Sequence, residues 1–187
     1  MNSKVAGKIA KYLLEEDEGY DYIKVKFFLE SILGEAEKFI LLLIIFGIFG
    51  YIADILLIMS VMLLLRPYLS GIHFKKYWVC FGYTLLICAV SIMSGHILRW
   101  NVYFFYISYV LVLTAIIILA PVKSEYRPEY KGRTRIIMKL KAVLSLGIIC
   151  IVSHMLGFTY RMEVAGILCI LFFDVVWSYV RGKEGMV

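Results

Sequence analysis

Long apolar segments dominate the chain and leave little room for any fold other than a membrane protein. They lie at residues 39–49, 51–65, 77–98, 100–120, 142–158 and 163–181. Hydrophobic residues make up 62% of the 187 positions, whereas a soluble domain has roughly 45–50%. The pattern predicts an all-α, polytopic integral membrane helical bundle with about six membrane segments, forming a single domain over residues 1–187.

The N-terminal region differs from the rest of the chain. Residues 1–38 combine lysines and an acidic run with apolar side chains at partly helical spacing, so we expect interfacial amphipathic helices there. The membrane bundle is expected over residues 39–181, with a basic loop over residues 121–141. The first two apolar segments are short for a bilayer core of about 30 Å, so residues 39–65 could instead form one tilted span.

The distribution of positive charge favours six segments. With six segments and a cytoplasmic N-terminus, 18 of the 20 Lys and Arg residues lie on the cytoplasmic side, and only Arg99 and Arg161 lie outside. A single span over 39–65 gives a much weaker bias. The positive-inside rule therefore predicts that both chain ends are cytoplasmic, with Gly47 and Gly50 supplying the turn between the first two segments.

The sequence gives no sign of a metal, a cofactor or a nucleic-acid partner. Its four cysteines, at positions 80, 88, 150 and 169, show no CxxC spacing, which argues against a disulfide framework and a zinc site. His96 and His154 have no neighbouring ligand residues in the sequence. Asp54 and Asp174 interrupt apolar segments, and intramembrane acids usually face a partner or a cavity.

The polar break after residue 65 brings together a base and a nucleophile. It contains Arg66, Gly71 and His73, and Cys80 follows. Residues seven apart in one straight helix are separated by about 10.5 Å along its axis, so His73 and Cys80 cannot react together within one regular helix. We expect the chain to bend at Pro67 and Gly71, with His73 in a loop or reentrant turn and Cys80 in the first turns of a helix that starts near Lys76 or Tyr77. A helix N-terminus favours a thiolate. The plainer interpretation is that Cys80 is a buried core residue and that His73 is an interfacial polar residue whose hydrogen bonds are satisfied.

This pattern resembles the accessory gene regulator B family, the integral-membrane cysteine endopeptidases that process a bacterial quorum-sensing propeptide. The matching elements are Arg66, Gly71 followed by His73, Cys80 seven positions later, and Ala120-Pro121 before the basic residues Lys123 to Lys141. The chain departs from the family pattern at Ser70, where a second glycine is common, and at Phe74, where small residues are common.

The resemblance implies a reaction and a set of roles. Cys80 is the nucleophile that cleaves off the C-terminal tail of a precursor through an acyl-enzyme thioester, which allows cyclisation to a thiolactone or lactone, and His73 is the general base and acid. The supporting or substrate-binding candidates are Arg66, Gly71, Glu30, Lys131, Arg133 and Arg135. The implied partners are a propeptide with an amphipathic leader and an acidic tail, membrane lipids and a second copy of the chain. The active site is expected on the cytoplasmic side of a bacterial cell membrane.

Alternatives remain at this stage. The basic loop could anchor anionic lipids rather than dock the acidic tail. The competing function is a small transporter or scaffold in which Asp54, Asp174 and the histidines line a pathway, although the sequence lacks the repeat symmetry that is common in transporters.

Overall fold

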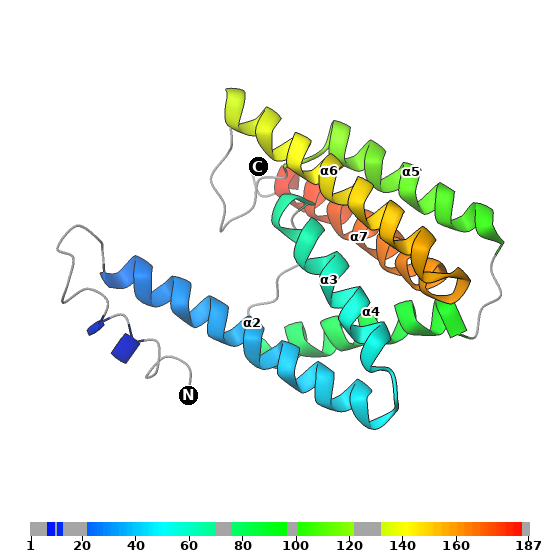
Figure 1. Ribbon diagram of the computed structural model, residues 1–187. Coiled ribbons are helices and arrows are strands. Elements are labelled where there is room, and N and C mark those ends of the chain that lie inside the picture. The colour runs from blue at the N-terminus through cyan, green and yellow to red at the C-terminus, as the bar shows by residue number, and fades with distance from the viewer. Residues whose placement is uncertain are drawn as a thin grey trace. The chain divides into compact units, whose positions relative to one another are not determined.

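The computed structural model describes residues 7–9, 11–12, 22–69, 76–96, 101–121 and 132–184. Within these residues the long elements are all α-helices and no β-strand is present, which confirms the all-α fold (Figure 1). The helices are α2 (Tyr22–Ile48), α3 (Ile52–Leu69), α4 (Tyr77–His96), α5 (Val102–Ile118), α6 (Gly132–Leu156) and α7 (Phe158–Glu184). The chain divides into two compact units, Met1–Gly50 and Tyr51–Val187, which are described separately below.

The first unit contains α2, which is one continuous helix. It crosses the expected boundary at residue 38 without a break, so the C-terminal part of the amphipathic region and the first apolar segment share a helix. The reason is that a change in hydropathy reports where a segment enters the apolar core of the bilayer. It does not report where the helix ends, which depends on capping and backbone geometry. Two ion pairs support its polar turns: Lys26 with Glu30 at 3.8 Å and Lys38 with Glu35 at 2.7 Å.

A glycine turn ends α2. Gly50 has φ +83°, a left-handed conformation that suits glycine, and its N–H donates to the Gly47 carbonyl at 3.0 Å. Because α3 begins at Ile52, the helix is interrupted within residues 39–65, as the two-segment prediction requires.

In the second unit, α7 packs against α3, α4, α5 and α6 (Figure 1). Its buried side chains form much of the core, and they include Met162, Val164, Ile167, Leu168, Leu171 and Val175. The turn between α6 and α7 is a single residue, Gly157, with φ +106°. The helix α7 is therefore the central helix of this unit, and its side chains face the other four helices.

Among the described residues, four helices are long and apolar enough to cross a membrane: Ile52–Leu69, Tyr77–His96, Gly132–Leu156 and Phe158–Val180. The apolar α5 is shorter, with 17 residues. Large apolar side chains such as Trp78 and Met155 are 72% and 82% exposed, as lipid-facing residues are. The protein is thus a helical membrane protein.

Two helix ends differ from the sequence expectation. The helix α3 continues through Pro67 to Leu69, so the bend expected at Pro67 was wrong and the apolar segment expected to end at residue 65 gains a further turn that carries Arg66. The bend expected at Gly71 lies outside the described residues. The helix α6 begins at Gly132, so the expected loop over residues 121–141 is shorter and Arg133, Arg135, Lys139 and Lys141 are helical. Lysine and arginine are good helix formers, so their charge ends an apolar stretch without ending a helix.

Candidate functional site

Cys80 lies in the first turn of α4, which begins at Tyr77 as the sequence predicted. Its N–H donates to the Lys76 carbonyl at 3.1 Å, and its own carbonyl accepts a hydrogen bond from the Thr84 hydroxyl at 3.0 Å. The side chain is 5% exposed, on the same buried helix face as Thr84 and Cys88. The thiol thus faces the interior of the bundle at the positive end of a helix.

The other three cysteines occupy different surroundings. All four are among the described residues, and none is in a disulfide. Cys88 lies fully buried in the middle of α4, and Cys150 and Cys169 are half-buried within α6 and α7. Of the four, only Cys80 lies in the first turn of a helix.

A polar cluster lies one helical turn beyond Cys80. The Tyr83 hydroxyl donates to Oδ1 of Asp174 on α7, and Asp174 is 3% exposed. Arg66, half-buried in the last turn of α3, lies close enough for its charge to act on Tyr83, Cys88 and Asp174. Polar side chains of α4 and α7 therefore bond to each other one turn beyond Cys80 with the charge of Arg66 on α3 nearby, and Asp174 has the intramembrane partner that its burial demands.

The structure describes only some of the residues predicted for the site. His73, Gly71 and Lys131 lie outside the described residues, so the geometry of the Cys80–His73 pair stays a prediction. Arg133 and Arg135 are exposed near the start of α6. Glu30 belongs to the first unit, where it pairs with Lys26.

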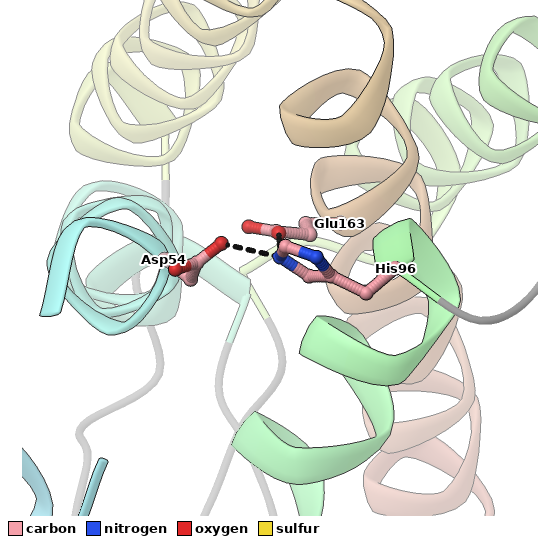
Figure 2. Close-up of side chains that lie close together, drawn as sticks. All are labelled: Asp54, His96 and Glu163. Atoms are coloured by element: carbon pink, nitrogen blue, oxygen red, sulfur yellow. Dashed lines mark hydrogen bonds and ion pairs between the residues drawn. The ribbon is translucent and has the colours of Figure 1, made fainter. Parts of the chain in front are cut away.

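A second polar cluster lies at the opposite end of α4. His96 is the last residue of that helix, and its Nε2 lies 2.8 Å from Oδ1 of Asp54 on α3 and 3.2 Å from Oε1 of Glu163 on α7. Figure 2 shows the two carboxylates converging on one edge of the imidazole ring. Asp54 and Glu163 are buried, whereas His96 is more exposed.

Sequence reasoning missed this second cluster because its members come from three distant helices. It identified Asp54 as an intramembrane acid in need of a partner, but it found no ligand neighbours for His96 and did not single out Glu163. The available signal was Glu163 itself, an acid at the very start of an apolar segment. Only the packing of α3, α4 and α7 brings these residues together.

Comparison with known proteins supplies the family. The sequence model of the accessory gene regulator B family matches residues 3–180. A protein named "Putative AgrB-like protein" from Clostridium beijerinckii is 32% identical over 130 residues, which cover 67% of this chain and 62% of the relative. A protein of the same name from Clostridium acetobutylicum is 28% identical over 140 residues, covering 75% of this chain and 66% of the relative.

The matched region thus spans slightly less than two thirds of the length of each of these relatives. No solved structure matches the chain. The family match covers nearly the whole sequence and includes the segment from Arg66 to Cys80 as well as the bundle that follows it. The chain belongs to the accessory gene regulator B family.

Proposed function

We propose that the protein is a membrane-embedded cysteine endopeptidase that removes the C-terminal tail of a quorum-sensing peptide precursor. The observation that supports this most is the position of Cys80, which alone among the four cysteines lies in the first turn of a helix, next to the segment that contains His73 in the sequence. Membership of the accessory gene regulator B family supports a role in the same signalling system.

The proposed chemistry uses two residues. His73 accepts the Cys80 proton, and the thiolate attacks the carbonyl carbon of the scissile peptide bond. The C–N bond breaks, the departing amine takes the proton from His73, and the leader and core of the precursor remain on Cys80 as a thioester. The thiolate of an internal cysteine of the precursor then attacks that thioester carbonyl, which releases Cys80 and closes a thiolactone. An internal hydroxyl would give a lactone by the same exchange.

Arg66, Tyr83 and Asp174 act in this proposal as positioning residues. Tyr83 is three residues beyond Cys80, so its bond to Asp174 holds the start of α4 against α7. The charge of Arg66 balances that of Asp174 and belongs to the last turn of α3. The cluster therefore fixes the helix end that carries the nucleophile, and a well-positioned nucleophile is a large part of catalysis.

The acidic tail of the precursor is the proposed partner of the basic residues before and within the start of α6. Arg133 and Arg135 are exposed there, and Lys131 precedes them in the sequence. Positive charge on the same side of the membrane as Cys80 attracts an acidic tail over a Debye length of about 8 Å. The charge distribution supports a multi-pass topology in a bacterial cell membrane with this site on the cytoplasmic side, and we propose a homodimer as the working form.

The direct test is cleavage of a tail-tagged precursor in membranes that contain one variant of the protein. The substrate is a peptide with an amphipathic leader, a cysteine-containing core and an acidic tail, taken from a short reading frame next to the gene if one encodes it. Cys80→Ala should reduce cleavage to background, while Cys88→Ala on the same face of the same helix should keep most of the activity. His73→Ala should be about as damaging as Cys80→Ala, and the double variant no worse, since the residues of one catalytic unit give non-additive losses.

The two cysteine variants form a matched pair because both remove a buried thiol from α4. Equal losses in both would mean that helix packing, rather than thiol chemistry, sets the activity. Retained cleavage in Cys80→Ala would refute the proposal.

A further inference from the structure

The cluster at the end of α4 away from Cys80 has the composition of a metal site. It offers one imidazole nitrogen and two carboxylate oxygens from three helices, and the three candidate ligand atoms all lie within 4.8 Å of one another. Two ligands about 2.1 Å from a tetrahedral metal ion lie about 3.4 Å apart. The separation of Nε2 from Glu163 Oε1, 3.2 Å, is close to this value, whereas its separation from Asp54 Oδ1, 2.8 Å, is shorter and is that of a hydrogen bond.

Glu163 provides an independent indication of a missing ligand. Its side chain is fully buried, and among the described residues its carboxyl group interacts only with the other two members of the cluster, Asp54 and His96. An ionised carboxylate is expensive to bury without compensation. The N–H of His96 can donate to one oxygen at a time, and Asp54 is the nearer acceptor. A divalent cation in the position of the proton on His96 would bind the carboxylates of Asp54 and Glu163 and neutralise both of their charges.

The surrounding backbone is shaped to hold Glu163 at this point. Gly95 on α4 lies so close to α7 that a Cβ there would be 2.5 Å from Glu163 Cγ and 2.7 Å from the Thr159 carbonyl oxygen. The Tyr51 ring packs edge-on to the His96 imidazole, with 5.2 Å between centroids, and limits its rotation. The imidazole is 38% exposed, which leaves one side open for an ion to enter.

We propose that Asp54, His96 and Glu163 bind a divalent first-row transition metal ion such as Zn²⁺ that joins α3, α4 and α7. An imidazole ligand favours such ions over Mg²⁺ and Ca²⁺, and three protein ligands leave a coordination position for water. His96 is sixteen residues beyond Cys80, so the site lies about 24 Å along the helix axis from the proposed nucleophile. The metal therefore stabilises the bundle and takes no part in the thiol chemistry.

The experiment measures zinc binding by the full-length protein, purified in detergent with a tag that lacks histidine. The protein is stripped with a chelator, exposed to Zn²⁺, desalted and analysed for metal by mass spectrometry. The wild-type protein should retain one zinc ion per chain. His96→Gln and Glu163→Gln should retain almost none. His154→Gln is the matched control, because it removes an exposed histidine that is hydrogen-bonded to Tyr106 outside the cluster.

A second readout does not depend on the variants folding well. At free Zn²⁺ of about 100 times Kd, the thermal midpoint of the stripped wild-type protein should rise by about 5–10 °C. His154→Gln should show the same rise. If the wild-type protein binds no zinc and its midpoint does not move, the cluster is a proton-sharing network and the metal proposal is wrong. Equal zinc retention by wild type and His96→Gln would overturn it as well.

Discussion

At the scale of single residues, the buried acids of this bundle contact side chains on other helices, whereas buried hydroxyls such as those of Thr84 and Ser91 donate to carbonyls of their own helix. Asp174 bonds to Tyr83, and the Ser94 hydroxyl donates to the Met162 carbonyl at 2.9 Å as well as to a carbonyl of its own helix. Within a bilayer no water is available to hydrogen-bond these polar groups. The loss of one bond therefore leaves the other group of the pair without a hydrogen-bond partner. The Tyr83–Asp174 bond joins α4 to α7 at a position three residues beyond Cys80.

Tyr83→Phe should therefore destabilise the protein by about 1–3 kcal/mol, because it removes a hydroxyl and leaves the Asp174 carboxylate without that donor. Denaturant unfolding in detergent micelles measures the change. Tyr103→Phe is the control, since that side chain is 68% exposed and should change stability by less than about 0.5 kcal/mol. If both variants unfold alike, the bond contributes nothing to the fold.

The sequence identified several of these residues but not their pairings. Asp54 and Asp174 stood out because acids are costly in apolar segments, and both have partners in the structure. Tyr83 and Glu163 did not stand out, because a tyrosine in an apolar run and an acid at its edge are ordinary features. A pairing depends on which helix faces turn toward each other, and helical periodicity in one sequence does not specify this.

At the scale of the elements, close contact between α4 and α7 organises the second unit. Small residues make that contact possible: a Cβ on Gly166 would be 2.4 Å from the Ser94 hydroxyl oxygen, and one on Gly95 would meet α7 at a similar distance. Interfaces between membrane helices use small residues in this way to bring backbones together. The contact links the end of α4 that carries the metal-site proposal to the centre of the bundle.

Gly95→Ala should push α4 and α7 apart and cost about 1–3 kcal/mol of stability, since one of the clashing atoms is a backbone oxygen. Gly82→Ala on the same helix meets nothing within 4 Å and should be neutral or stabilising by up to about 1 kcal/mol. Thermal unfolding of both variants checks this. A stability of Gly95→Ala equal to that of Gly82→Ala would contradict the close helix contact.

Most helix positions were predictable, whereas several helix ends were not. The start of α4 at Tyr77 and the interruption near Gly50 agreed with the sequence, because a polar break precedes the first and a glycine turn marks the second. The ends at Leu69 and Gly132 did not, because charged residues continue a helix past its apolar part. Hydropathy therefore located the apolar segments better than it located the helix boundaries.

At the scale of the whole molecule, charge placement predicts which side of the membrane each loop occupies. In a variant without its native cysteines, a single cysteine at position 124 should be shielded from an impermeant thiol reagent added to intact cells, and one at position 100 should be labelled. Both positions lie outside the described residues, so only the count of 18 to 2 supports this prediction. Permeabilised cells, in which both positions should react, provide the control.

The reverse labelling pattern would place Cys80 on the outer side and refute a cytoplasmic active site. It would also put the Asp54–His96–Glu163 cluster on the cytoplasmic side, since His96 and Cys80 lie at opposite ends of α4. The fold itself would be unaffected, because helix packing does not depend on which way the bundle is inserted.

The central claim is that Cys80 attacks the precursor, and the most direct measurement is the mass of the intact protein after brief reaction with that precursor. The account predicts an adduct with the mass of the leader and core, located on Cys80, removed by hydroxylamine, and absent from Cys80→Ala but present in Cys88→Ala. Cleavage of the precursor by Cys80→Ala at the wild-type rate, or an adduct on another cysteine, would contradict the account.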